Sequence, residues 1–184
     1  WRIDTTYSGG NILEGVVHEL DFTRSMFGDL QFASATASGR VTSEEHESPV
    51  VLQAVLEFAG GASATCRMGD WVGFDGGGTW IAGTTGTLHF TGWTDPVWLH
   101  EPGQAPRSFD VADELAYDRE LADLISAIES GGEPENSGQN GLQNLGLGLA
   151  LYQSIARGER MSFADGMPDD VTGDYQYRGP NTII

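Results

Sequence analysis

Residues 12–41 read ILEGVVHELDFTRSMFGDLQFASATASGRV, and the spacing of apolar residues changes within this stretch. Up to residue 27 the apolar side chains recur at steps of three and four, which is typical of one face of a helix. The positions that follow this spacing are Leu13, Val16, Val17, Leu20 and Phe27. After Gly28 the sequence becomes rich in short β-forming runs. The stretch therefore predicts a helix over 12–27 that leads into a β-sheet, and hence an α+β fold.

Short strands separated by glycine turns are predicted between residues 30 and 111. Gly60 and Gly61 lie between PVVLQAVLEF and ASATCRM, which indicates a hairpin. Gly83 and Gly86 flank a tight turn between TWIA and TLHF, and further short strands are expected at PVWLH and RSFDV. About six strands joined by short turns indicate a mainly antiparallel or mixed sheet.

Two more helices are predicted toward the carboxy terminus. In residues 113–130 an apolar stripe ends at Gly131 and Gly132; it consists of Leu115, Leu121, Leu124, Ile125 and Ile128. Residues 141–158, GLQNLGLGLALYQSIARG, predict a helix with three glycines in or near its interior. Each of these glycines costs up to about 1 kcal/mol relative to alanine, so we expect this helix to pack closely against another element.

The charge balance argues against nucleic acid as a partner. The chain has 184 residues, enough for one core, with 27 acidic residues, nine basic residues that are all arginine, and a formal net charge of −18. Binding to phosphates needs a basic stripe, which such a sequence does not supply. A salt-adapted protein and an acidic protein from a GC-rich genome, where lysine codons are scarce, both explain this composition.

Cys66 and the hydropathy profile indicate a reducing, cytoplasmic setting. A single cysteine cannot form an internal disulfide, and Cys66 lies in an apolar strand-like run, so we expect an inert buried thiol. No apolar run approaches the roughly 20 residues that span a bilayer, so no membrane partner is expected. Four tryptophans fit either burial in a core or interface or stacking on a sugar, and the sequence does not decide between these roles. They are Trp71, Trp80, Trp93 and Trp98.

Glu14, His18 and Asp21 are the candidate site residues. Their steps of four and three place them on one face of the predicted helix. Neighbouring carboxylates favour the imidazolium and partial burial opposes it, so His18 can be poised to exchange a proton near neutrality. This is what the oxidation of a hydroxyl to a carbonyl requires of its general base.

Two other interpretations of these residues stay open. Glu14 follows Asn11 by three residues, so the pair fits a capping box, and a carboxylate beside a histidine is also common on helix surfaces. Glutamate and histidine four residues apart can hold zinc. We predict no metal site, because HELDF lacks the second histidine of the HExxH motif.

Residues 8–22, SGGNILEGVVHELDF, resemble the segment of the Gfo/Idh/MocA oxidoreductase family that reads approximately GGG-x-L-x-D-x-G-x-H-x-x-D. Three further pieces resemble this family in the same order. They are VLEFAGGASATCRM, WIAGTTGTLHF, and the helical stretch 120–161 that resembles the closing pair of helices.

The resemblance implies an open sheet with helices packed on one face. It implies that residues 1–160 form the carboxy-terminal substrate domain of an enzyme acting on a sugar, polyol or related small molecule, with 161–184 as an arm of the same domain. His18 occupies the position of the proton acceptor or donor, and Glu14 that of the acid that contacts or orients the substrate, where aspartate is common. Asp21 is interpreted as structural.

The resemblance also implies an amino-terminal Rossmann domain that binds NAD or NADP, in cis or in trans. The 184 residues contain no G-x-G-x-x-G after a strand and, without lysine, no E-K-P motif, so we expect this chain alone to hold no cofactor and to be inactive. The start at Trp1 favours a domain cut from a longer enzyme. The alternative is a non-catalytic ligand-binding or oligomerisation module. A homo-oligomer through the sheet is the expected assembly.

Overall fold

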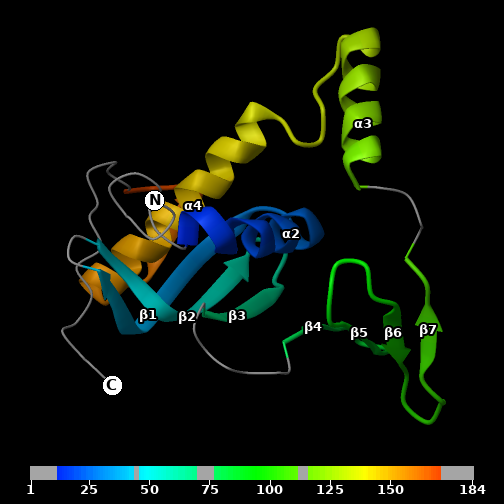
Figure 1. Cartoon of the computed structure of the whole chain (residues 1–184), viewed down its shortest axis with the longest axis horizontal. Coiled ribbons are helices and arrows are strands. Elements are labelled where there is room, and N and C mark those ends of the chain that lie inside the picture. The colour runs from blue at the N-terminus through cyan, green and yellow to red at the C-terminus, as the bar shows by residue number, and fades with distance from the viewer. Residues whose placement is uncertain (1–11, 44–45, 70–76, 112–115, 171–184) are drawn as a thin grey trace. The chain divides into compact units, whose positions relative to one another are not determined.

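The computed structural model describes residues 12–43, 46–69, 77–111 and 116–170 (Figure 1). The chain divides into two compact units. The first unit consists of Trp1–Val72 and Glu135–Ile184, and the second unit is Gly73–Pro134. In the described ranges, no helix has the length and apolar character that crossing a membrane requires.

The first unit contains an antiparallel sheet in the order β3-β2-β1-β8-β9. Its strands are β1 (Leu30–Ser43), β2 (His46–Phe58), β3 (Ser63–Gly69), β8 (Met161–Ala164) and β9 (Met167–Pro168). β1 pairs with β2 from Leu30 opposite Phe58 to Ser43 opposite His46. The turn between β2 and β3 uses Gly61 at a φ of 87°, a conformation that favours glycine. The hairpin predicted around Gly60 and Gly61 is therefore confirmed.

The predicted helix over 12–27 is also confirmed, with one irregular turn. It begins as the π-helical turn η1 (Ile12–Val16) and continues as α2 (Val17–Phe27). The helix ends at Gly28, which has a φ of 81° and donates its N–H to the carbonyl of Arg24 at 2.8 Å. Leu20 is fully buried, as the apolar spacing predicts. Asn11, the other half of the predicted capping box, lies outside the described residues.

Helix α4 (Gly138–Arg157) is capped by Ser137, whose side chain accepts the N–H of Asn140. At Gly146 a Cβ atom would lie 3.0 Å from Cδ of Pro168 in β9, closer than ordinary van der Waals contact. The close packing predicted for this glycine-containing helix is thus confirmed at Gly146. Gly141 differs, because a Cβ there would meet nothing within 4 Å.

The core of the first unit lies between one face of the sheet and helices α2 and α4 (Figure 1). Along β1, Ala33 and Ala35 are buried on this face, whereas Ser34 and Thr36 between and beyond them point to the other. The largest fully buried side chains of the core are Leu20, Leu56, Phe58, Leu147, Leu151 and Tyr152. This is the arrangement of an antiparallel sheet that is covered on one side.

The second unit contains a four-stranded antiparallel sheet in sequence order and one helix. The elements are β4 (Thr79–Ala82), β5 (Thr87–Phe90), β6 (Val97–His100), β7 (Arg107–Phe109) and α3 (Ala116–Ser130). All four strands and the helix agree with the sequence prediction. The apolar stripe of α3 is exposed in the structure, with Leu121 at 56% and Ile128 at 72%. The apolar periodicity predicts helix α3, but it does not specify whether the apolar stripe of this helix is covered.

The α+β class and the antiparallel pairing are confirmed, but the strand count differs from the prediction. About six strands were expected, and the described residues form nine in two sheets. The additional strands β8 and β9 lie at 161–168, in the segment expected to be an arm, and they are too short to give a visible alternation. Asp165 and Gly166 join them with φ values of 51° and 75°, as in a type I′ hairpin turn. Residues 171–184 lie outside the described ranges.

Candidate functional site

Helix α2 and the π turn before it carry the candidate site residues. Glu14 lies in the π turn and is half-buried, and His18 lies in the first turn of α2 and is exposed. A π turn holds more residues than an α turn, so the angular relation of Glu14 to His18 departs from the regular four-residue spacing. On the other side of the same helix, Val16 and Leu20 are buried in the core. The helix is therefore fixed to the core while the imidazole of His18 stays accessible.

Asp21, three residues after His18, has a structural role. Its Oδ1 atom accepts hydrogen bonds from Nδ2 of Asn140 at 2.9 Å and from Nδ2 of Asn144 at 2.5 Å. Both asparagines belong to α4, so the carboxylate of Asp21 joins the two helices that cover the sheet. The structural interpretation of Asp21 is confirmed.

Arg24 extends this contact between α2 and α4. Its Nη1 atom donates to Oδ1 of Asn140 at 2.9 Å and to Oδ1 of Asn144 at 2.5 Å, and its Nη2 atom donates to Oε1 of Gln143. Arg24 is only 8% exposed. Burial lowers the pKa of its guanidinium, while the charges of Asp21 and Asp29 act in the opposite direction.

We call Asp21, Arg24, Asn140, Gln143 and Asn144 the interhelix network. Sequence reasoning did not find it, because it joins residues about 120 positions apart. A signal was present on each helix. Asp21 and Arg24 are three residues apart, and Asn140 and Asn144 are four apart, so each pair shares one helix face. The network fixes the orientation of the helix that presents His18.

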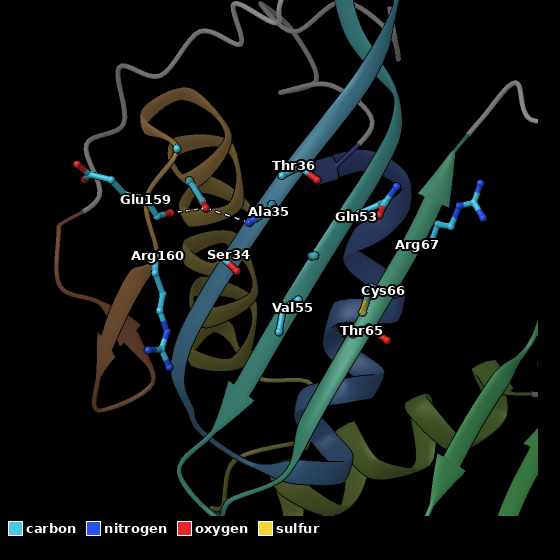
Figure 2. Close-up of a pocket in the computed structure, with 13 residues that line it drawn as sticks. Ser34, Ala35, Thr36, Gln53, Val55, Thr65, Cys66, Arg67, Glu159 and Arg160 are labelled. Atoms are coloured by element: carbon cyan, nitrogen blue, oxygen red, sulfur yellow. Dashed lines mark hydrogen bonds between the residues drawn. The ribbon is translucent and has the colours of Figure 1, made fainter.

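A cavity of about 510 Å³ lies over the sheet of the first unit. Figure 2 shows that its lining comes from β1, β2, β3 and the segment before β8; it includes Ser34, Thr36, Gln53, Val55, Thr65, Arg67 and Arg160. Neither Glu14 nor His18 lines it. The guanidinium of Arg160 at its rim lies 3.6 Å above the ring of Phe32 and forms an ion pair with Glu57 at 2.5 Å.

Cys66 also lines this cavity, and its thiol is not activated. Burial raises the pKa of Cys66 to about 11, and the negative charge of Glu19 acts in the same direction. A thiol with this pKa is protonated near neutrality and is a weak nucleophile. The buried state expected for Cys66 agrees with this shift, although the side chain is partly accessible.

Ser154 joins α4 to the cavity wall. Its hydroxyl accepts the N–H of Ala35 at 2.9 Å and donates to the carbonyl of Glu159 at 2.5 Å (Figure 2). Ser154 is fully buried. The hydroxyl therefore satisfies a backbone group of β1 that would otherwise be buried without a partner. Within the described ranges, no three side chains of His, Cys, Asp or Glu are grouped in a way that could hold a metal ion.

Comparison with known families finds a match over the amino-terminal part of the chain. A family model described as GFO/IDH/MocA C-terminal domain matches residues 1–89, a range that includes Glu14 and His18. Residues 1–89 thus match the Gfo/Idh/MocA carboxy-terminal domain, and the resemblance seen in the sequence is confirmed.

Solved structures share the fold at low sequence identity. Levoglucosan dehydrogenase, in complex with NADH and levoglucosan, superposes with a TM-score of 0.77 and 19% identity over 90% of this chain and 53% of its own. An aldose-aldose oxidoreductase from Caulobacter crescentus, complexed with glycerol, gives 0.75 and 20% identity over 89% of this chain and 50% of its own. An NAD binding oxidoreductase from Klebsiella pneumoniae superposes with a TM-score of 0.76 and 17% identity, over 90% of this chain and 54% of its own. This chain spans about half the length of these proteins.

Proposed function

We propose that this chain is the substrate domain of an NAD(P)-dependent oxidoreductase that acts on a sugar, a polyol or a related small molecule. The observation that carries the proposal is the exposed imidazole of His18 within the segment that matches the family. The structural relatives support the substrate class, since two of them were solved with levoglucosan or glycerol.

His18 is assigned the proton transfer at the oxygen of the reacting carbon. In the oxidation direction the imidazole accepts the hydroxyl proton, and in the reduction direction it returns that proton to the carbonyl oxygen. The anchoring of α2 supports this role, because Leu20 and Arg24 are buried on the helix that exposes His18. A general base works only when its ring is held in reach of the substrate. Glu14, one turn earlier, is assigned the orientation of the substrate or of the imidazole.

The described residues do not fit the nucleotide. A dinucleotide is held by a glycine-rich turn that joins a strand to the first turn of a helix. Among the described residues, α4 follows a loop that ends at Ser137 and not a strand, and the sequence has no G-x-G-x-x-G after a strand. We therefore assign NAD or NADP, and the hydride that it exchanges, to a separate amino-terminal Rossmann domain in cis or in trans.

The test is turnover after a change at His18, in the chain combined with its nucleotide-binding half. A panel of sugars and polyols with NAD and with NADP first identifies a substrate. His18→Ala is then expected to lower kcat by about 100-fold or more, which is typical of a lost general base. Glu19→Gln changes the adjacent exposed residue and is the matched control, with kcat expected to stay within about twofold. Unchanged turnover in His18→Ala would instead support a non-catalytic ligand-binding or oligomerisation module.

A further inference from the structure

The outer side of the helix layer in the first unit carries a line of residues that begins at His18. His18, Phe22 and Met26 of α2 follow one another at steps of four, so they share one side of the helix. His18 is exposed, Phe22 is half-buried and Met26 is 47% exposed. Leu20 and Arg24 project from other sides of α2 and are buried. The line therefore faces away from the core and from the interhelix network.

Helix α4 continues this surface. Leu142 and Leu145 are three residues apart, share one side of α4 and are 48% and 44% exposed. The other sides of α4 are occupied, since Leu147 is fully buried in the core and Asn144 belongs to the interhelix network. Because this network joins α2 to the first half of α4, the two exposed leucines lie beside the line on α2. We call Phe22, Met26, Leu142 and Leu145 the outer helix surface.

Helix α4 contains no acidic residue, which is unusual for this chain. Of the 184 residues 27 are acidic, so 20 residues carry about three on average, yet the 20 residues of α4 carry none. Helix α3, with 15 residues, has four; they are Asp118, Glu120, Asp123 and Glu129. Charged residues are depleted at the centre of protein interfaces. The composition of α4 thus favours an outer side that a partner covers.

The proposed reaction needs a second wall opposite His18. An alcohol that is oxidised to a carbonyl gives its hydroxyl proton to His18 and the hydride of the same carbon to NAD(P)⁺. Reacting atoms lie about 3–3.5 Å apart, so His18 and the cofactor must contact the substrate from two sides. The cavity of the first unit lies over the sheet and is not lined by His18. The nucleotide-binding half must therefore approach the side of the helix layer that exposes His18.

We propose that the outer helix surface is where the nucleotide-binding half docks, which closes the substrate site over His18. The inference rests on the proposed function, which supplies this partner. The structural relatives leave room for it, since this chain spans about half of their length. An interface between two domains takes about 600–1,500 Å² and is more polar than an obligate interface. Four apolar residues bordered by the polar His18 and Ser25 fit the centre of such an interface.

Met26 reports on docking through its own side chain. Hydrogen peroxide oxidises an accessible thioether to the sulfoxide, and a covered thioether reacts more slowly. Mass spectrometry of proteolytic peptides measures oxidation in the 184-residue chain and in the chain combined with its nucleotide-binding half. The rate at Met26 is expected to be about fivefold lower, or less, in the combined sample. Met161, which is 5% exposed, is expected to react slowly in both samples, and added free methionine calibrates the peroxide.

Leu145→Glu tests the surface without changing the reporter. A carboxylate in a covered apolar contact is unfavourable, so Met26 is expected to regain most of its reactivity in the combined sample. Its rate in the chain alone is expected to stay the same. Ile128→Glu is the matched control, because it makes the same kind of change on α3 at a residue that is 72% exposed. Met26 is expected to stay protected in this control and in His18→Ala, which lowers turnover only.

Three outcomes would overturn the docking surface. One is an equal oxidation rate of Met26 with and without the nucleotide-binding half. Another is a Met26 that is already protected in the chain alone at every concentration, since another segment of the chain would then cover it. The third is protection that grows with the concentration of the chain alone, since a second copy would then be the occupant. Loss of turnover in His18→Ala with Met26 unprotected would leave the proposed function standing and remove only the docking surface.

Discussion

Arg24 of α2 and Asn144 of α4 are 120 residues apart in the sequence and are joined by a hydrogen bond of 2.5 Å between Nη1 and Oδ1. Both side chains are buried, with 8% and 5% exposure. Asn144 also donates from Nδ2 to Asp21, so both the oxygen and the nitrogen of its side-chain amide form hydrogen bonds. The contact is one of several that hold α2, and with it His18, in a single position on the rest of the first unit.

Replacing Arg24 with methionine is expected to lower the free energy of unfolding by about 3 kcal/mol. Methionine has a similar length but donates no hydrogen bonds, so oxygens of Asn140, Gln143 and Asn144 lose a charged donor in a buried place. Urea unfolding of the intact chain measures the difference. Arg67→Met is the control, since Arg67 is exposed, and its effect is expected to be within about 0.5 kcal/mol. Equal effects of the two variants would show that the interhelix network adds nothing to stability.

Ser154→Ala is expected to destabilise the chain by about 1–3 kcal/mol. The change leaves the buried N–H of Ala35 without its acceptor and removes the donor to Glu159, while creating almost no cavity. Ser25→Ala is the matched control, because the Ser25 hydroxyl donates to the carbonyl of Phe22 on an exposed surface. Its effect on urea unfolding is expected to be within about 0.5 kcal/mol. A loss of the same small size in Ser154→Ala would contradict the assigned role.

Two glycines of α4 are expected to respond to alanine with opposite signs. At Gly146 a Cβ would lie 3.0 Å from Cδ of Pro168 and 3.4 Å from Cε of Met167, so Gly146→Ala is expected to destabilise by about 1 kcal/mol or more. At Gly141 the space is open, and Gly141→Ala is expected to stabilise by up to about 1 kcal/mol through helix propensity. Thermal melts of the two variants make the comparison. A stabilising effect at both positions would mean that β9 shifts to accommodate the methyl group at position 146.

The elements of this fold that the sequence predicts are those with a local signal. The helix at 12–27 and the β2–β3 hairpin follow from residue spacing and glycine position within a few turns of chain. The β8–β9 hairpin also had a signal, the Asp165–Gly166 pair, but strands of four and two residues show no alternation. For α3 the apolar stripe predicted a helix, and its exposure depends on tertiary placement, which spacing does not encode.

The residues of the candidate site also differ in whether a local sequence signal predicts them. Asp21 was assigned a structural role from the motif, and its two hydrogen bonds to α4 confirm that role. The remaining members of the interhelix network come from segments that meet only in the folded chain, so no local pattern specifies their contact. The assignments of His18 and Glu14 stay predictions, to be decided by turnover.

The high negative charge is expected to make stability depend on salt. At a formal charge of −18 the surface repels itself, and the screening length falls from about 30 Å at 0.01 M to about 3 Å at 1 M salt. The Tm of the chain is therefore expected to rise between these two concentrations of KCl, with a larger rise for a salt-adapted protein than for one that is merely acidic. Sorbitol at equal osmolality is the control for a general solute effect. A Tm that does not change with KCl would rule out salt adaptation.

Alkylation of Cys66 tests how well the face of β3 that packs against the core shields the thiol. Because burial raises the pKa of the folded thiol to about 11, iodoacetamide is expected to react slowly at pH 8 and faster only as the pH approaches that value. The unfolded chain in urea, whose thiol has a pKa of about 8.5, is expected to react faster at pH 8. Since the folded pKa is the higher one, protonation of Cys66 contributes stability that is complete below about pH 8.5 and is lost as the pH rises through about 11. Equal reaction rates of the folded and unfolded chain at pH 8 would show that the thiol is not shielded, and Cys66→Ala would then leave the alkaline unfolding transition unchanged.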